Sequence, residues 1–419
     1  MPRYLKFNLI VSKCTMAMYK IDENASKTTK ILYKLLRVVI NIVLFSGLIL
    51  TAINVVLINF EKGKLEIDKM AVEIMTIIIF FSAIFRTNYF YFCENKLERV
   101  VKTINKFKHK TTTGFEEKNL NNCVKITKMF VVLWSFSVFF TGQFMALLPL
   151  FEIHKVGRVL PLPLWYPFDS KQTPYYQIIY LTQIVTQHFM VFSYGNSDMF
   201  FSCTTIFITE QFTLLGWTLK NLIHTVLLKH GIDKKSIETF TESTKNNEIL
   251  EVFAKNSFKN DLKKGLIDCV EDYQVLLDVC DEMQTFFSPL LLPEMLLGIF
   301  YCIFIMYAIA VTSEVSTLMR LVEYLAMCYA EIFCLTYLGQ KLFDESEVLL
   351  NDIYEIPWYL CDDTFKKMFN ILQTKLSKPI TVTAWKFFDM KLTTFLFAIK
   401  TSFSFLAFLR QVTEEESKI

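Results

Sequence analysis

The sequence is poor in helix-breaking residues and in charge. Its 419 residues include only 11 glycines and 10 prolines, and 20% of them are charged. A soluble domain of this length would carry more charge and less apolar surface. The sequence is instead 53% hydrophobic and holds 41 phenylalanines. These proportions exclude an ordinary soluble protein and predict long, mostly unbroken helices that face lipid and one another.

Motifs of catalysis are also missing. None of the five histidines stands in a His-Glu-x-x-His pair, and there is no Gly-x-Ser-x-Gly and no phosphate-binding loop. We therefore expect no enzyme activity and no cofactor. The basic residues are dispersed between apolar runs, which argues against nucleic-acid binding. The first 20 residues lack the apolar core of a signal peptide, so we expect the first membrane helix to direct its own insertion.

Seven segments are predicted to cross a membrane, which takes about 20 residues of helix. Four contain no Asp, Glu, Lys or Arg: Val38–Phe60, Met129–Phe151, Gln172–Ser197 and Met295–Ser313. Three more contain charges: Ala71–Cys93, Leu318–Gln340 and Phe388–Leu409. Most of these charges lie near helix ends, where a side chain can reach water, but Glu331 and Lys400 lie deeper. We expect these three helices to face protein or water.

The Lys and Arg residues between the spans alternate between rich and poor segments. Residues 1–37, 94–125, 209–285 and 341–387 hold eight, eight, nine and six, whereas the intervening segments hold three, three, none and two. Because Lys and Arg favour the cytoplasmic side, the N-terminus is predicted to be cytosolic and the C-terminus extracellular. This topology is opposite to that of a G-protein-coupled receptor. None of the ten cysteines falls in a predicted outer loop, so no extracellular disulfide is expected.

Amphipathic helices are expected in the cytosolic segments. Apolar residues recur every three or four positions, apart from one step of seven that Met283 or Gln284 would fill, and predict a helix that runs into the fifth span. They are Leu262, Leu266, Val270, Tyr273, Leu277, Cys280 and Phe287. Phe207–Leu228 should continue the fourth span in the same way. Asp344–Leu376 should form a further helix that Pro357 kinks or splits. The polar stretch Glu238–Asn247 is predicted to be a flexible hinge. We expect the apolar stripes to pack on one another and on neighbouring subunits.

Several motifs resemble those of insect odorant receptors. In the last third of the chain they are Tyr337-Leu338-Gly339-Gln340-Lys341-Leu342 with Glu345-Ser346, Ile353-Tyr354, Trp358-Tyr359, Thr393-Thr394-Phe395-Leu396, and Lys400-Thr401-Ser402-Phe403-Ser404-Phe405 with Leu409-Arg410. Phe403 stands where tyrosine is commoner in that family. The segments Leu164-Trp165-Tyr166-Pro167-Phe168-Asp169, Asp272-Tyr273-Gln274 and Phe286-Phe287-Ser288 are also similar to the family. The resemblance covers most of the chain.

The resemblance implies an all-α, seven-transmembrane-helix protein with the inverted topology and with cytosolic helical extensions that form an anchor domain. It also implies a tetrameric, non-selective cation channel that small volatile odorants open. The family's shared coreceptor usually has a longer cytosolic loop after the fourth span. This chain therefore resembles an odorant-specific tuning subunit, which would assemble with the coreceptor into a heterotetramer in the plasma membrane of olfactory sensory neurons.

The same resemblance divides the chain by role. Residues 1–206 would hold spans 1 to 4 with a ligand pocket in their outer halves, and residues 207–285 the cytosolic extensions. Residues 286–341 would hold spans 5 and 6, residues 342–387 the anchor helix, residues 388–410 the pore-lining seventh span, and residues 411–419 an extracellular tail.

Candidate ligand-binding residues follow from the outer halves of the second, third, fourth and sixth spans, where the family takes up odorants. They are Ile78, Phe81, Phe140, Gln143, Phe144, Tyr180, Gln183, Ile184, His188, Tyr324, Leu325 and Cys328. Apolar walls with few polar groups suit small volatile molecules, and Tyr324, Gln183 or His188 could orient one by a hydrogen bond. We expect the ligand to shift the sixth and fourth spans and thereby the outer end of the final helix.

Candidate pore residues lie on that final helix, which lines the pore in the family. They are Thr401, Ser402, Leu406 and Leu409. A ring of leucines could gate by dewetting, although ordinary helix packing explains their spacing equally well.

Other functions stay open on the sequence. A gustatory-type receptor channel shares the architecture, but its usual final-helix signature, a Thr-Tyr pair with a later Gln-Phe, is absent. A transporter of small molecules would also place polar residues in its spans, but the sequence shows no twofold internal repeat. A metabotropic receptor conflicts with the predicted topology.

Overall fold

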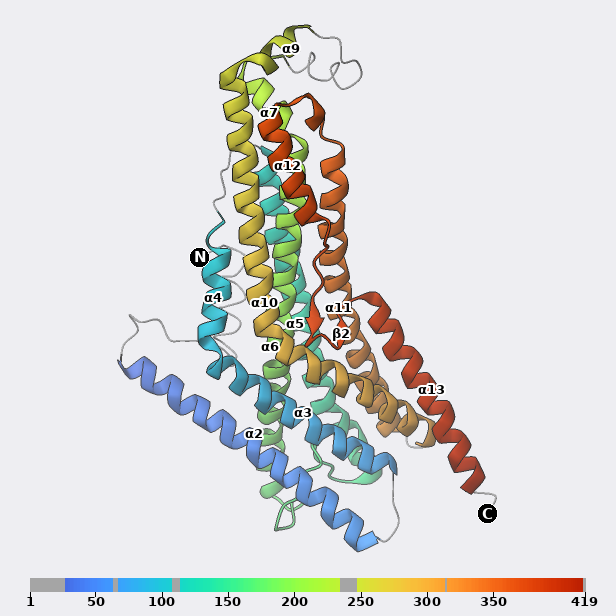
Figure 1. Cartoon of the computed structure of the whole chain (residues 1–419). Helices are drawn as coiled ribbons and strands as arrows, with labels where there is room; N and C mark the ends of the chain where they lie inside the picture. The colour runs from blue at the N-terminus through green and yellow to red at the C-terminus, as the bar shows by residue number, and fades with distance from the viewer. Residues whose placement is uncertain (1–26, 63–66, 108–113, 234–246, 313–314, 417–419) are drawn as a thin grey trace.

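The structure, a computed structural model, describes residues 27–62, 67–107, 114–233, 247–312 and 315–416. This part of the chain is almost entirely helical (Figure 1). Its elements are α2 (Lys27–Lys62), α3 (Ile67–Phe92), α4 (Glu94–Ile104), α5 (Gly114–Val156), α6 (Tyr175–Lys220), α7 (Leu222–Lys229), α9 (Asn247–Ala254), α10 (Asn256–Val311), α11 (Val315–Tyr354), the 3-10 turn η1 (Trp358–Leu360), α12 (Asp363–Leu376), β1 (Thr383–Ala384), β2 (Phe388–Asp389) and α13 (Leu392–Glu416). The predicted hinge lies outside the described residues except for Asn247, which begins α9.

Six of the described helices are long and apolar enough to cross a membrane: α2, α3, α5, α10, α11 and α13. They correspond to six of the seven predicted spans. The remaining predicted span, Gln172–Ser197, lies mostly in α6, a helix of 46 residues. The all-helical fold is therefore confirmed.

Helix α6 separates its polar and apolar side chains onto different faces. It contacts α2, α3, α5, α10 and α11. Gln183, Gln187, Asn196 and Asp198 are each less than 5% exposed and lie on the side toward the bundle. The outward side is apolar, since Leu181 is 64% exposed, and such a surface requires lipid or another protein against it.

A column of helices extends beyond the splayed helices α2, α3 and α13 (Figure 1). It contains the ends of α6, α10 and α11 together with α7 and α12, and one hydrophobic core runs through it. The predicted amphipathic stripe before the fifth span is confirmed at Leu262, Leu266 and Tyr273, which are buried, but it is wrong at Leu277, which is 37% exposed. The neighbouring Leu276 is buried in its place, and Met283 fills the step of seven, as predicted.

The chain between α11 and α13 is divided as Pro357 predicts. Helix α11 ends at Tyr354, the turn η1 follows, and α12 begins after Asp362, whose side chain accepts a hydrogen bond from the Phe365 amide at 3.3 Å. The predicted start of the final span at Phe388 is wrong. Phe388 and Asp389 pair as β2 with Ala384 and Thr383 of β1, so the helix begins only at Leu392.

This two-stranded hairpin is fixed to α10 by hydrogen bonds. Gln284 accepts a bond from the Thr383 amide at 2.9 Å, and the Ser288 hydroxyl accepts one from the Trp385 amide at 2.6 Å. Trp385 and Lys386 form the turn with positive φ values of 48° and 64°. The hairpin therefore holds the start of α13 at a set place on the bundle.

A glycine lets the hairpin approach α11 closely. A Cβ atom on Gly339 would overlap the carbonyl oxygen of Met390, which directly follows β2. Because the obstacle is backbone, no change of rotamer could relieve it. Steric exclusion by the Met390 backbone therefore requires glycine at this position of the Leu338-Gly339-Gln340 motif.

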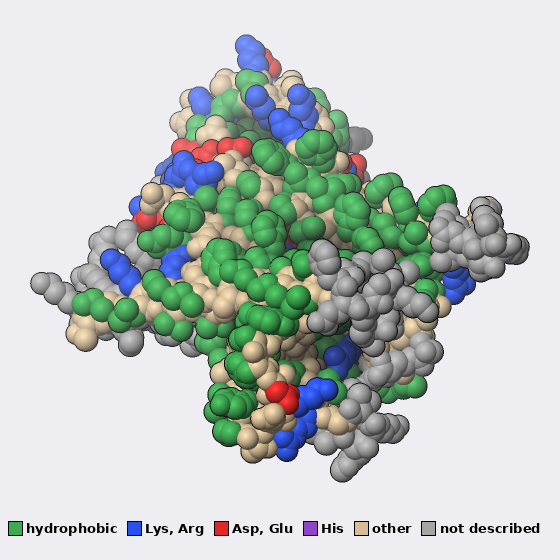
Figure 2. All heavy atoms as spheres, turned by 90° about the horizontal axis from the view of Figure 1, so that it is seen from below, with side chains coloured by type: hydrophobic (Ala, Val, Ile, Leu, Met, Phe, Trp, Pro, Cys, Tyr) green, Lys and Arg blue, Asp and Glu red, His purple; other side chains and the backbone are tan. Residues whose placement is uncertain are grey.

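The surface of the lower bundle is apolar. Figure 2 shows hydrophobic side chains over most of the face seen from that end. Large side chains such as Ile42 on α2, Phe136 on α5 and Phe403 on α13 are 61%, 67% and 57% exposed. A contiguous surface of this kind requires lipid or another protein against it.

Candidate functional site

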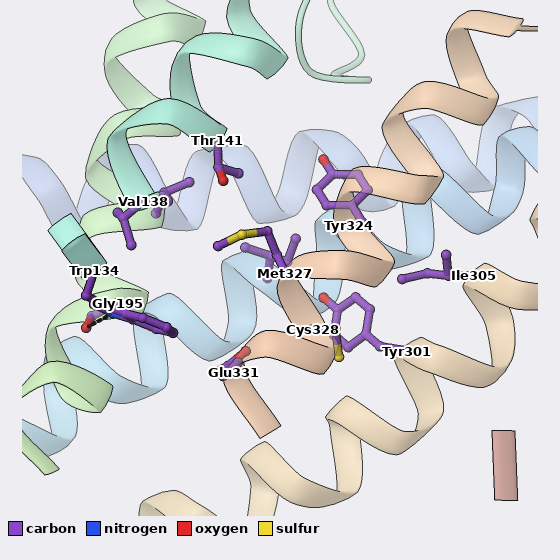
Figure 3. Close-up of a pocket in the computed structure, with 12 residues that line it drawn as sticks. Trp134, Val138, Thr141, Gly195, Tyr301, Ile305, Tyr324, Met327, Cys328 and Glu331 are labelled. Carbon is purple, nitrogen blue, oxygen red and sulfur yellow. Dashed lines mark hydrogen bonds between the residues drawn. The ribbon is translucent and has the colours of Figure 1, made fainter. Parts of the chain in front are cut away.

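A cavity of about 120 Å³ lies inside the bundle. One residue of α3 lines it together with residues of α5, α6, α10 and α11 (Figure 3). The lining residues are Ile79, Trp134, Val138, Thr141, Val191, Gly195, Tyr301, Ile305, Tyr324, Met327, Cys328 and Glu331. For comparison, an engineered apolar cavity of about 150 Å³ binds benzene. The volume therefore suits a small organic molecule.

Helical spacing brings these residues to one place. On α11 the four lining residues, Tyr324, Met327, Cys328 and Glu331, follow the i, i+3, i+4, i+7 pattern of one helix face. Figure 3 shows Thr141 and Tyr324 at one end of the cavity and Glu331 at the other, with Met327 between them. The wall is thus mostly apolar and carries a few polar groups near its ends.

Two of the polar lining groups are held by their own hydrogen bonds. The Tyr301 hydroxyl donates to the carbonyl of Met75 at 2.8 Å, which joins α10 to α3. The Trp134 indole donates to the carbonyl of Gly195 at 3.1 Å, which joins α5 to α6 (Figure 3). These bonds fix the positions of two ring systems, so the cavity has a defined shape without a ligand.

Two of the twelve predicted ligand-binding residues, Tyr324 and Cys328, line this cavity. The other ten are not among its lining residues in the described part of the chain: Ile78, Phe81, Phe140, Gln143, Phe144, Tyr180, Gln183, Ile184, His188 and Leu325. A predicted residue can miss the cavity by a single position. Ile79 lines it, whereas the preceding residue on the same helix, Ile78, does not. One residue turns a helix by about 100°.

Four of the displaced polar residues have hydrogen-bond partners outside the cavity wall. Gln183 accepts a hydrogen bond from the Leu162 amide at 2.9 Å and donates to the Tyr166 hydroxyl at 3.1 Å, so it holds the loop between α5 and α6. Tyr180 donates to the carbonyl of Ala146. Gln143 and His188 hydrogen-bond each other at 3.1 Å between α5 and α6.

The displaced aromatic residues face outward or stack on one another. Phe81 and Phe140 are 55% and 57% exposed. Phe144 stacks on Phe140, with ring centroids 6.3 Å apart. Leu325 packs against the hydrophobic core rather than into the cavity. An amphipathic pattern cannot separate a lipid-facing aromatic from a ligand-facing one, because both surroundings are apolar.

A buried charge cluster adjoins the cavity. The Arg86 guanidinium lies 2.8 Å from Asp198, 3.2 Å from Glu294 and 3.4 Å from Glu331, measured between nitrogen and oxygen. It also donates to the Ser197 hydroxyl at 3.0 Å. The three carboxylates offer oxygens within 4.8 Å of one another, a spacing that a cation could bridge.

Sequence reasoning found only part of this cluster. It singled out Glu331 as an interior charge and placed Arg86 in a charged span, but it took Asp198 and Glu294 as boundaries of spans. Helices α6 and α10 instead continue through both acids, because Arg86 on α3 supplies a partner. Four helices, α3, α6, α10 and α11, therefore meet at one ionic contact.

Aromatic contacts join the cavity helix to the final helix. The rings of Tyr329 and Phe333 on α11 lie 6.5 Å and 5.3 Å from the ring of Phe395 on α13, centroid to centroid. Tyr329 directly follows Cys328 of the cavity wall. A movement of α11 at the cavity would thus reach α13 within two helical turns.

Three of the four predicted pore residues, Ser402, Leu406 and Leu409, share one face of α13 at i, i+4, i+7 spacing, and Thr401 lies about 100° from Ser402. Ser402 is fully buried and donates to the carbonyl of Ala398 at 2.8 Å, so it presents no surface to a pore. Leu409 packs toward Ile299 and Ile303 of α10. Thr401 and Leu406 are partly exposed.

The comparisons with known proteins agree with this architecture. The family model for the seven-transmembrane odorant receptor matches residues 66–403. Odorant receptor 83a of Drosophila melanogaster is 22% identical over 383 residues, which cover 86% of this chain and 83% of that protein. Putative odorant receptor 85e of the same fly is 24% identical over 371 residues, which cover 82% of this chain and 78% of that protein.

A solved structure shows the same fold. The insect olfactory receptor OR5 of Machilis hrabei, in complex with eugenol, superposes with a TM-score of 0.77 at 16% sequence identity, and the match covers 98% of each chain. With a family model that spans most of the sequence, the comparisons show that this chain belongs to the insect odorant receptor family.

Proposed function

We propose that this chain is the odorant-binding, tuning subunit of a ligand-gated, non-selective cation channel. It would assemble with coreceptor subunits into a heterotetramer in the plasma membrane of olfactory sensory neurons. The observation that carries the proposal is the mostly apolar cavity between α5, α6, α10 and α11, whose wall shares a helix with the contacts to α13. The relative of known structure binds eugenol, a small organic molecule of the kind that such a cavity admits.

The ligand would act through α11. Tyr324 and Cys328 contact it, and Phe333 two turns further passes a shift to Phe395 on α13. Binding opens the pore only if the ligand contacts are better in the open state than in the closed one. We place the pore surface on the part of α13 that includes Thr401 and Leu406, with Leu409 near its outer end.

The inverted topology belongs to the same proposal. The Lys and Arg distribution favours a cytosolic N-terminus and an extracellular C-terminus. The column of α6, α7, α10, α11 and α12 would then project into the cytosol as the anchor domain, and its exposed apolar residues, such as Leu228 at 50%, would meet neighbouring subunits.

Current recordings test the function. Cells that express the chain together with a coreceptor should show cation currents under a panel of volatile odorants, and the effective panel should differ from that of the coreceptor alone. A chain that produces no ligand-dependent current with any coreceptor, despite arrival at the cell surface, would contradict the proposal. Accumulation of a labelled compound without current would favour the transporter, and responses confined to sugars or bitter compounds would favour a gustatory-type channel.

A further inference from the structure

The cavity has a negatively charged end. Glu331 lines it and is 8% exposed, and the same side chain belongs to the ionic cluster with Arg86, Asp198 and Glu294. These four side chains carry three acids and a single base. In their ionised forms they hold an excess of two negative charges in a buried place, where an uncompensated charge is costly.

Two oxygens of the cluster have no hydrogen-bond partner within the described chain. They are Oδ2 of Asp198 and Oε1 of Glu294, and both side chains are 3% exposed. Arg86 therefore does not satisfy the acids around it completely. An additional positive charge beside these acids would offset their negative charge, and an additional hydrogen-bond donor would satisfy the unpartnered oxygens.

The charge cluster borders the cavity on one side. Of the three acids, Glu331 alone is among the lining residues, so a molecule in the cavity meets the cluster at that carboxylate. The rest of the wall suits a short hydrocarbon: Ile79, Val138, Val191, Ile305 and Met327 supply apolar surface. The site thus combines one acidic end with an apolar body.

We propose that this cavity is selective for small aliphatic or aryl-alkyl amines in their protonated form, with the ammonium group against Glu331 and the hydrocarbon against the apolar wall. This inference deepens the proposed function and rests on it. A protonated amine supplies the missing positive charge and up to three N–H donors, whereas an alcohol of the same skeleton supplies one donor and no charge.

Isosteric ligand pairs test the proposal. 3-Methylbutan-1-amine is compared with 3-methylbutan-1-ol, and 2-phenylethylamine with 2-phenylethanol, on cells that express the chain with its coreceptor. We expect the half-effective concentration of each amine to be lower than that of its alcohol by about tenfold or more, the ratio for a hydrogen bond to a charged group. Equal or weaker potency of both amines in the wild type would overturn the inference.

Two variants locate the effect. Glu331→Gln should bring the half-effective concentrations of each amine and its alcohol to about the same value, and the alcohol response of the same variant is the internal reference for folding and gating. Glu347→Gln is the matched control, because Glu347 is an exposed acid on the same helix and is not among the residues that line the cavity; it should keep the amine preference. Loss of amine preference in both variants, or in Glu347→Gln alone, would overturn the assignment to Glu331.

Binding to the purified chain supplies a readout that does not need gating. The amines should raise the midpoint of thermal unfolding of the wild type in detergent more than the alcohols do, and Glu331→Gln should remove the difference. If no compound of the panel produces current, but the amines still raise the unfolding midpoint more than the alcohols do, the result contradicts the channel function and supports the amine site. If alcohols produce current without amine preference in either assay, the amine site fails and the channel function stands.

Discussion

The ring of Phe333 on α11 meets the ring of Phe395 on α13 edge to face, with the centroids 5.3 Å apart. Aromatic pairs in this geometry contribute about 0.5–1.5 kcal/mol beyond the area that they bury. Because the cavity borders the same helix, this pair links the cavity helix to the proposed pore helix. It should therefore contribute to gating rather than to ligand binding.

Replacement of Phe333 by alanine should weaken the coupling. We expect a half-effective ligand concentration about two- to tenfold higher, the range that corresponds to the energy of one aromatic pair, and a smaller maximal current. Dose–response recordings, normalised to surface labelling, measure both. Phe300→Ala is the control, because that ring on α10 is 56% exposed. Equal shifts in the two variants would show that the effect is general loss of packing.

Tyr324 should set ligand sensitivity through its hydroxyl. Tyr324→Phe keeps the ring in the cavity wall and removes one hydrogen-bonding group, so sensitivity to ligands with a polar group should fall by about two- to tenfold. Sensitivity to a hydrocarbon analogue should stay the same. The control is Phe81→Ala, because Phe81 is exposed on α3 and does not line the cavity. An unchanged dose–response across the ligand panel would remove Tyr324 from the site.

Two thiols at the cavity form a chemical probe. The Sγ atoms of Cys302 and Cys328 lie 3.5 Å apart, and Cys328 lines the cavity. A trivalent arsenical bridges two neighbouring thiols, so a small one should add once to the native chain and join α10 to α11. Peptide mass mapping detects the bridge, and Cys302→Ser or Cys328→Ser should prevent it. A saturating ligand should slow the reaction; capture at an unchanged rate would place the ligand elsewhere.

Gly339 should tolerate no side chain. Gly339→Ala forces a Cβ atom into the Met390 backbone, so we expect a loss of about 3 kcal/mol in the free energy of unfolding, at the upper end for overpacking. Thermal unfolding followed by size-exclusion chromatography in detergent measures the change. In Gly298→Ala the new Cβ meets the tip of the Ile332 side chain at 3.1 Å, and that tip can move. A milder loss for Gly298→Ala is therefore expected, and equal losses would contradict the steric account.

The helices could be predicted because long apolar runs and amphipathic stripes leave little choice of secondary structure. Pro357 marked a true break, and the stripe from Leu262 correctly predicted that α10 runs from the column into the membrane span. The start of the final helix could not be predicted. Phe388 and Asp389 look like the first residues of an apolar span, and only their pairing with Thr383 and Ala384 shows that they form a strand.

The site was harder to predict than the fold, for two physical reasons. The first is rotation: Tyr324 and Cys328 line the cavity, whereas Leu325 between them faces the core. The second is long-range pairing. Asp198 follows the predicted fourth span and Glu294 precedes the fifth, and a charge at such a position indicates the end of a membrane span. Both acids can lie inside the bundle only because Arg86, on another helix, pairs with them.

Helix α10 sets a limit on how this chain can change its length. Its 56 residues form one continuous helix about 84 Å long, bent where Pro289 and Pro293 lie within it (Figure 1). One inserted residue above that bend would rotate the column-facing side by about 100° relative to the cavity-facing side and advance it by about 1.5 Å. The relative orientation of Leu262 and Tyr301 around the helix therefore depends on the number of residues between them. Insertions are compatible with this architecture only in the connecting loops.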